Sequence, residues 1–305
     1  MRLALTGATG FVGKAVVEAA LGAGHSVRAL TRRTQAPRDH VAWVEGDLAD
    51  EAALATLCEG SGDCADAVIH IAGLTSTPDP ARFEPANVAG TANLLAAARE
   101  AGIARFVFVS SLAAREPDLS AYGASKAKAE GLVEQSGLDW TIVRPPAVYG
   151  PHDAEMFELF RSAKLGVVPL PPRGATSIIH VEDLARLLVA LSGRSNLKRI
   201  YEPDDGREGG WSHKELAQAI GHAVGKSRVF APGLPRPVLD LAARADRLVR
   251  REGAKLTPDR VGYMTHPNWV ARSAFALPAE LWEPQIGGQE GLKATAQWYR
   301  KEGWL

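Results

Sequence analysis

The sequence predicts an α/β protein with a doubly wound parallel sheet and a smaller, partly interleaved C-terminal domain. Short apolar segments alternate with Ala-rich helical segments over the first 145 or so of its 305 residues. The apolar segments lack polar alternation, which is typical of strands buried on both faces. A glycine-rich turn follows the first of them. Alternating strand and helix favours right-handed crossovers, and therefore a parallel sheet with helices on both faces.

The elements of the first domain follow from these patterns. The predicted strands span residues 3–6, 26–30, 41–45, 67–72, 105–110 and 141–144, each short and rich in Val, Ile, Phe or Leu. The predicted helices span residues 11–23, 51–59, 83–101 and 120–136, where apolar residues recur at helical spacing.

Proline-rich connections begin after Arg144 and change the texture of the chain. Another strand, helix and strand are predicted at 177–180, 182–192 and 200–201. We therefore expect a dinucleotide-binding domain at 1–150, with 176–203 returning to it, and a substrate domain formed by 151–175 and 204–305. Ser212 and Glu215 have the spacing of a capping box at a helix start. A closing amphipathic helix is expected at 290–298.

Charge and composition exclude several classes of partner. The 35 Lys and Arg residues balance 35 Asp and Glu, so the chain offers no overall electrostatic case for nucleic acid or an anionic membrane. Cys58 and Cys64 match no zinc or redox spacing. No run of about 18 apolar residues occurs, and the start of the chain lacks a signal-peptide h-region. We expect a soluble cytoplasmic protein that takes a small-molecule substrate, with no metal.

The first turn carries the pattern of a phosphate-binding loop. Glycines at 7, 10 and 13 follow a strand and open a helix. Gly7 permits the tight turn, Gly10 lets the backbone approach a pyrophosphate, and Gly13 lets the helix pack close to the strand. The helix N-terminus adds free N–H groups. This is the Rossmann arrangement, and the residues expected to contact the cofactor are Gly7, Thr9, Gly10, Phe11 and Val12.

The end of the second predicted strand indicates which dinucleotide binds. Thr31 occupies the position where NAD sites usually carry an acid, and Arg32 and Arg33 follow it. A guanidinium can grip a 2′-phosphate, whereas a carboxylate would repel it. The pattern favours NADP, with NAD as the alternative. Asp47 and Leu48, after the third strand, are placed to border the adenine.

A tyrosine and a lysine four residues apart form the catalytic hypothesis. Tyr122 and Lys126 would lie on one face of a helix, about a turn apart. A lysine ammonium lowers the pKa of a nearby phenol, which can then exchange a proton with a carbonyl or alcohol oxygen. Ser110 and Ser111 end the preceding strand, where a hydroxyl would hold the substrate oxygen.

These motifs together resemble the extended branch of the short-chain dehydrogenase/reductase superfamily, the NAD-dependent epimerase/dehydratase type. The resemblance covers residues 1 to about 190. It rests on the glycine loop, Asp47-Leu48, residues 70–73, Asn87 and the residues after it, Ser110-Ser111, Tyr122 with Lys126, the Arg-Pro-Pro segment at 144–151, and residues 180–183.

The resemblance implies roles for individual residues. Tyr122 would be the general acid/base, Ser111 rather than Ser110 would orient the substrate oxygen, and Lys126 would also bond the nicotinamide ribose. Further cofactor contacts are implied for Ala72, Gly73, Asn87, Pro146 and Val148. For His180 and Asp183 the family suggests structural roles, with Asp183 capping the following helix. A homodimer is possible by family habit.

Three functions stay open at this point. Ala147 stands where nucleotide-sugar epimerases resemble one another through an Asn, and the Arg-Pro-Pro segment is closer to reductase and steroid-dehydrogenase-like members. We therefore expect an NADP-dependent oxidoreductase that transfers a hydride between nicotinamide and a ketone or alcohol, acting on an apolar small molecule. The alternatives are a nucleotide-sugar epimerase or dehydratase, and a non-catalytic NADPH-binding accessory or sensor protein.

Two further segments carry alternative interpretations. The first contains Phe157, Phe160, Val167, Val168 and Leu170, which suit either an apolar substrate pocket or simple core packing. The second is a predicted helix near 237–251 with four arginines at 244, 247, 250 and 251. Such a run is typical of a solvated face, with a lid or a contact with an acidic ligand as alternatives.

Overall fold

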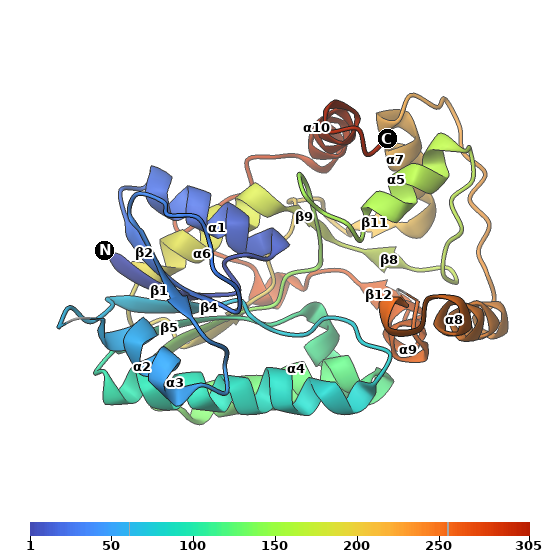
Figure 1. Cartoon of the computed structure of the whole chain (residues 1–305). Helices are drawn as coiled ribbons and strands as arrows, with labels where there is room; N and C mark the ends of the chain where they lie inside the picture. The colour runs from blue at the N-terminus through green and yellow to red at the C-terminus, as the bar shows by residue number, and fades with distance from the viewer. Residues whose placement is uncertain (61, 255) are drawn as a thin grey trace. The chain divides into compact units, whose positions relative to one another are not determined.

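The computed structural model describes residues 1–60, 62–254 and 256–305, which form two compact units (Figure 1). Unit 1 contains residues 1–144 and 184–201, and unit 2 contains residues 145–183 and 202–305.

Unit 1 is built on a seven-stranded sheet in the order β10-β6-β5-β4-β1-β2-β3. Every pairing in it is parallel. Its strands are β1 (Arg2–Thr6), β2 (Ser26–Thr31), β3 (Val41–Glu45), β4 (Ala67–His70), β5 (Arg105–Val109), β6 (Asp139–Val143) and β10 (Arg199–Tyr201). This order confirms the predicted doubly wound fold, in which the chain begins at β1 and winds outward in both directions.

Helices cover both faces of this sheet (Figure 1). The first helix, α1 (Phe11–Gly22), lies on the same face as α6 (Val181–Ser192), and α2 (Glu51–Glu59), α3 (Gly90–Glu100) and α4 (Ala121–Gln135) lie on the other. Asp50 caps α2 by accepting the N–H of Ala53 at 3.0 Å, and Ser120 caps α4. The core beneath α2, α3 and α4 includes Leu54, Leu94 and Phe106, all buried.

The segment predicted as a single helix at 83–101 is instead divided. A wider π-helical turn spans Glu84–Ala89 and the regular helix begins only at Gly90. Pro85 stands in the first turn, where an N–H would have no intrahelical acceptor in any case, so the proline does not explain the wider turn. π-Helical turns are rare and often occur at functional sites. Asn87 lies within this one.

Unit 2 contains two small sheets and a group of helices. Strands β7 (Ala147–Tyr149) and β9 (Ile178–His180) pair in parallel, and β8 (Ala175–Thr176) lies between β11 (Trp211–Ser212) and β12 (Asn268–Trp269). The helices are α5 (Phe157–Lys164), α7 (His213–Ala223), α8 (Arg236–Arg250), α9 (Pro258–Met264) and α10 (Gly288–Lys301). The capping box of Ser212 and Glu215 is confirmed at the start of α7.

The strand predicted at 177–180 differs from expectation in its partner. It was expected to return to the first domain, but β9 pairs with β7 inside unit 2. The predicted strand at 200–201 does join the large sheet, as β10 beside β6. Within the described part of the chain, no helix has the length and apolar character needed to cross a membrane.

Candidate active site

The glycine loop of unit 1 forms a tight turn against the end of β4. Gly7 has a φ of +77°, and a Cβ there would lie 2.8 Å from the backbone nitrogen of Ala72. A Cβ on Gly13 would overlap the carbonyl oxygen of Gly7. Gly10 precedes α1, and no side chain caps it. The first-turn N–H groups of α1 therefore have no intrahelical or side-chain acceptor, which suits an anion such as a pyrophosphate.

A buried polar network ties the end of β1 to β4 and α3. Thr91 donates to the carbonyl oxygen of Asn87 at 2.6 Å, so its oxygen accepts from Nε2 of His70 at 3.0 Å. Nδ1 of His70 then accepts from the Thr6 hydroxyl at 2.7 Å, and Thr6 accepts from the N–H of Ala72 at 3.1 Å. Burial, helped by the charge of Lys126, lowers the pKa of His70 to about 3. His70 is therefore a neutral bridge that fixes the loop containing Ala72.

Asn87 positions the loop after β4 against α4. Its side chain accepts from the N–H of Leu74 at 2.7 Å and donates to the carbonyl oxygen of Leu74 at 3.0 Å. It also donates to Ser125 at 2.9 Å, and Ser125 donates to the carbonyl oxygen of Tyr122 at 2.8 Å. Asn87 thus links the turn around Gly73 to the first turn of α4.

Lys126 is a buried ammonium aimed at the end of β5. Its Nζ donates to the carbonyl oxygen of Val109 at 2.8 Å and lies 4.7 Å from the ring centroid of Phe108. Burial lowers the pKa of Lys126 to about 8, and the charge of Glu130 partly offsets that effect. A Cβ on Gly73 would come within 3.5 Å of Nζ, so the glycine leaves space beside the ammonium.

Tyr122 and the two serines lie at the same end of unit 1. Tyr122, in the first turn of α4, is 8% exposed, and its ring centroid is 5.8 Å from that of Phe83. Ser111 is half-buried, and its Oγ accepts from the N–H of Ala113 at 3.2 Å. Ser110 is buried, and its Oγ has no hydrogen-bond partner among the described residues. The two neighbouring serines therefore differ in access to solvent.

The residues expected to select the dinucleotide follow β2 and β3. Thr31 is buried, donates to the carbonyl oxygen of Arg33 at 2.8 Å and accepts its N–H at 3.3 Å. This turn leaves Arg32 and Arg33 exposed. In the described part of the chain, no ion pair involves either guanidinium. Asp47 closes a turn, accepting the N–H of Ala49 at 2.8 Å through Oδ1.

The predicted site residues fall into two groups. The larger group belongs to unit 1 and comprises the glycine loop, Arg32, Arg33, Asp47, Leu48, Ala72, Gly73, Asn87, Ser111, Tyr122 and Lys126. Most of them follow the carboxyl ends of the parallel strands, which meet at one edge of the sheet and are where ligands bind in such folds. Pro146 and Val148 belong to unit 2. The sequence analysis did not predict that His70 bridges Thr6 and Thr91 by hydrogen bonds. The feature that could have indicated it is the position of His70 directly before the loop at 71–73.

Side chains considered for an apolar pocket in unit 2 instead pack in its core. Phe160 and Val168 are completely buried in a cluster with Phe157 and Leu170 at its edge. Val167 is 43% exposed.

Asp183, expected to cap its own helix, accepts the N–H groups of Gln285 at 3.2 Å and Ile286 at 2.9 Å.

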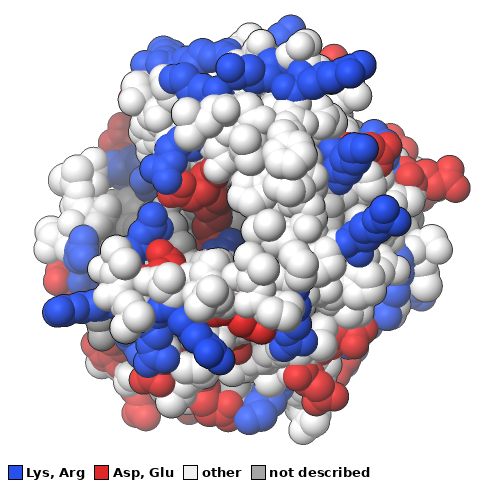
Figure 2. All heavy atoms as spheres, turned by 90° about the vertical axis from the view of Figure 1, so that its right-hand side faces the viewer, with Lys and Arg blue, Asp and Glu red and all other residues white. Residues whose placement is uncertain are grey.

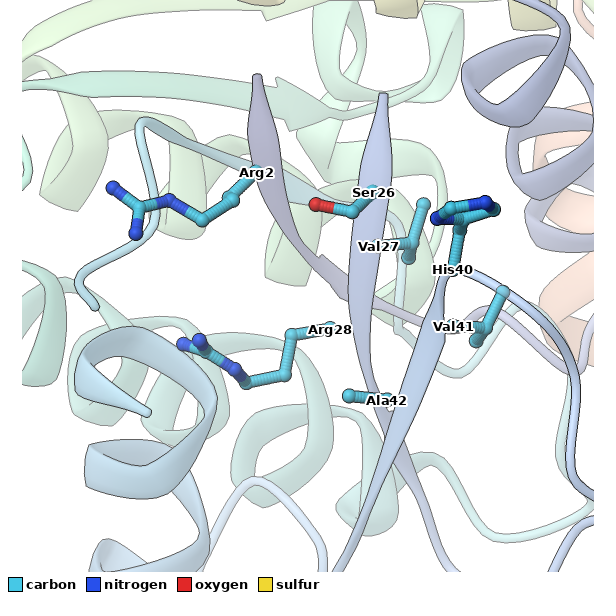
Figure 3. Close-up of a pocket in the computed structure, with 7 residues that line it drawn as sticks. All are labelled: Arg2, Ser26, Val27, Arg28, His40, Val41 and Ala42. Carbon is cyan, nitrogen blue, oxygen red and sulfur yellow. The ribbon is translucent and has the colours of Figure 1, made fainter. Parts of the chain in front are cut away.

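A shallow pocket of about 340 Å³ lies elsewhere in unit 1 (Figure 3). Its lining includes Arg2, Ser26 and Val41, which begin β1, β2 and β3, so it opens at the sheet edge opposite to Lys126. The guanidinium of Arg2 pairs with Asp63 at 2.5 Å, and Arg28 donates to the carbonyl oxygens of Leu57 and Asp63. These contacts hold the loop before β4, which gives the arginines a structural role.

Comparison with known proteins identifies the relatives of this chain. The family model for the NAD dependent epimerase/dehydratase family matches residues 3–202. A ceramide reductase of Caulobacter vibrioides is 37% identical over 99% of this chain and 96% of its own length. A 4-hydroxy-2-methyl-3-oxo-4-farnesyl-3,4-dihydroquinoline-1-oxide ketoreductase of Stigmatella aurantiaca is 33% identical over 68% of this chain and 69% of its own. A UDP-glucose 4-epimerase of Vibrio cholerae is 29% identical over 96% and 94%.

Solved structures show the same fold. The UDP-glucose 4-epimerase of Thermus thermophilus in complex with NAD has a TM-score of 0.72 at 24% identity, covering 98% of this chain and 99% of its own.

Proposed function

We propose that this chain, which belongs to the NAD-dependent epimerase/dehydratase family, is an NADP-dependent reductase of a ketone carried by an apolar molecule. Its relatives, which are named as reductases and as a hydroxysteroid dehydrogenase, make it an NAD(P)-dependent enzyme of the short-chain dehydrogenase/reductase type. The observation that carries the proposal is the buried ammonium of Lys126, fixed at 2.8 Å to Val109 and one helical turn from Tyr122.

The glycine loop fits a dinucleotide. Gly7 and Gly13 occupy positions that a Cβ would block, and α1 begins without a side-chain cap. Phe11 and Val12 would offer their N–H groups to the pyrophosphate, with Thr9 beside them in the same turn. Arg32 and Arg33 would take a 2′-phosphate, because both are exposed and Thr31 adds no competing negative charge. When bound, the nicotinamide supplies a hydride.

The proton chemistry belongs to the side chains around α4. Tyr122 would donate its phenolic proton to the carbonyl oxygen as the hydride reaches the carbonyl carbon. The charge of Lys126 favours the phenolate that remains. Because Lys126 is buried in a region of low dielectric constant, its attraction for the phenolate of Tyr122 is stronger than it would be in water. The space beside Gly73 would admit the nicotinamide ribose to Nζ of Lys126.

Ser111 is assigned to hold the substrate oxygen. Its Oγ accepts from Ala113, so the hydroxyl proton remains for donation to the substrate. Ser110 is buried with 4% exposure, and its side chain is less accessible to a substrate.

The apolar nature of the substrate is inferred from relatives. The first two curated relatives are named for ceramide and for a farnesyl-bearing dihydroquinoline oxide. The Vibrio epimerase is less similar to this chain, and Ala147 lacks the amide that sugar-nucleotide enzymes carry.

The proposal is tested by following coenzyme oxidation. The substrate panel would contain long-chain ketones, a keto analogue of ceramide, aromatic ketones and UDP-glucose, each with NADPH and with NADH. We expect turnover of an apolar ketone, faster with NADPH, and loss of roughly 10²–10⁴-fold in kcat for Tyr122→Phe. Tight NADPH binding without turnover of any ketone would contradict the reductase assignment. Conversion of UDP-glucose without net coenzyme oxidation would favour the epimerase.

A further inference from the structure

The helix α8 of unit 2 turns an apolar face to solvent. Leu241 and Leu248 are 68% and 81% exposed, and Val238 and Val249 are 47% and 82% exposed. With 3.6 residues per turn, these four side chains fall within roughly 100° of the helix circumference, in an arc that reaches roughly 140° with their exposed neighbours. The arc is completed by Pro237, Ala242 and Ala245, which are also exposed, and it contains no charged residue.

The opposite side of α8 makes its packing contacts. Leu239 and Ala243 are buried against Val261 of α9, with Leu234, Leu256 and Met264 at the edge of this small cluster. A surface helix of a water-soluble domain normally turns its apolar stripe to the core. In α8 only a narrow strip of small contacts faces inward, and the broader apolar stripe faces out. The four arginines at 244, 247, 250 and 251 are exposed, as the sequence predicts, and the same helix also exposes an apolar face.

Arginines border this apolar face. The stretch from Arg236 to Arg251 has five arginines against two aspartates. Asp240 pairs with Arg236 at 3.9 Å and Asp246 with Arg250 at 3.2 Å. Arg244 adjoins one edge of the arc, and the exposed Arg247 lies about 60° further round the helix from Arg244. Figure 2 looks at the side of Figure 1 on which α8 is drawn, and there Lys and Arg side chains border uncharged surface.

We propose that α8 docks the protein on an anionic lipid surface, its aliphatic face entering the boundary between headgroups and acyl chains. A helix with one broad aliphatic face and flanking arginines is the form that lies in a bilayer interface. Arg244 and Arg247 would pair with lipid phosphates. The zero net charge of the whole chain led to the expectation of no membrane partner, but α8 concentrates positive charge locally.

A second copy of the chain fits this face less well. A two-fold dimer brings the same patch against itself. The two aspartates of α8 already pair with Arg236 and Arg250, so they offer the other arginines no free carboxylate. The lipid surface supplies both the missing negative charge and an apolar layer.

The test is cosedimentation of the full chain with vesicles. Vesicles of phosphatidylcholine alone are compared with vesicles that also contain phosphatidylglycerol. We expect the wild type to bind the anionic vesicles at least about tenfold more tightly, because each arginine near the surface contributes to binding. The double substitution Leu241→Glu/Leu248→Glu should abolish binding. Arg244→Gln/Arg247→Gln should remove most of the preference for anionic lipid.

A matched control keeps the charge change but moves it to unit 1. Ala52→Glu/Gln135→Glu adds the same two negative charges at exposed helical positions, and it should bind as the wild type does. Thermal unfolding of each variant checks that the exposed substitutions leave the fold intact. The readout needs no turnover, so it stands or falls separately from the reductase assignment.

Two outcomes would overturn the proposal. One is wild-type protein that stays in the supernatant with both kinds of vesicle. The other is a dimer in gel filtration that Leu241→Glu/Leu248→Glu dissociates, which would assign the face to a second copy.

Discussion

The interiors of the two units differ in the interactions that stabilise them. In unit 1 the strand ends are joined by polar side chains, of which His70 and Lys126 are buried with lowered pKa values. In unit 2 the core centres on Tyr299, whose ring lies 5.0 Å from that of Phe157 and 5.2 Å from that of Phe160. Buried polar groups cost free energy unless they are paired, so their concentration in unit 1 supports placing the proposed chemistry there.

The largest effect on stability is expected from the aromatic core of unit 2. Tyr299 is completely buried and donates to the carbonyl oxygen of Asp153 at 2.8 Å. Tyr299→Ala should cost about 3–5 kcal/mol of unfolding free energy, and Tyr299→Phe about 1 kcal/mol for the lost hydrogen bond. Urea unfolding measures both. A small effect of the alanine variant would show that unit 2 does not depend on this core.

In unit 1 the matching experiment separates the two serines. Ser111→Ala should lower kcat by roughly 10²–10³-fold, the usual effect of removing a donor to a reacting oxygen. Ser110→Ala is the control and should retain most of the activity. Steady-state kinetics with the best ketone of the panel measures both variants. A larger loss of kcat in Ser110→Ala than in Ser111→Ala would assign the contact with the substrate oxygen to Ser110.

A smaller effect on coenzyme affinity is expected at the end of β2. Arg32→Gln/Arg33→Gln should weaken NADPH binding by about tenfold or more, because charge-assisted bonds to the 2′-phosphate are lost. NADH binding should stay within about twofold, since NADH lacks that phosphate. Titration calorimetry of both coenzymes gives the ratio. Equal losses for the two coenzymes would place the 2′-phosphate elsewhere.

The two units should also show pH dependences of opposite sign. His70 has a pKa of about 3 in the folded protein, below the ordinary 6.5, so its contribution to stability is present above pH 6.5 and is lost as pH falls. Between pH 6.5 and 5 this loss amounts to about 1.7 kcal/mol. His70→Gln, which cannot titrate there, should lack it in urea unfolding.

Asp153 of unit 2 should act in the other direction. Burial raises its pKa from 3.8 to about 7, although its oxygens accept N–H groups of Glu155 and Met156. Its contribution is therefore present at low pH and is lost as pH rises through 7. Between pH 5 and pH 8 the wild type should therefore lose unfolding free energy that Asp153→Asn keeps, because the asparagine does not titrate. An unchanged pH profile in both variants would contradict this picture of the buried charges.

The sequence was most informative where structure is local. The strands of the large sheet were predicted within about two residues, because strands buried on both faces consist of nearly continuous apolar residues. The glycine loop and the Tyr122–Lys126 pair were visible because each depends on spacing within a single turn. The division at Glu84–Ala89 was not predicted, since residues 83–101 keep an apolar spacing typical of one continuous helix.

Contacts between distant segments were beyond local patterns. The pairing of β9 with β7 joins residues that are 31 positions apart in the chain. The hydrogen bond between Tyr299 and Asp153 joins residues that are 146 positions apart. No periodicity within either segment specifies the other. The exposed apolar face of α8 depends on a distant contact too, because packing on α9 decides which side of the helix is exposed.

The central claim is that a hydride passes from coenzyme to a ketone at the Tyr122 site. The most direct measurement uses NADPH deuterated at both hydrogens of nicotinamide C4, because only one of them is transferred, with mass spectrometry of the product from the keto analogue of ceramide. We expect one deuterium on the new carbinol carbon, and loss of product in Tyr122→Phe. An unlabelled alcohol, or label retained in the coenzyme while UDP-glucose is converted, would contradict it.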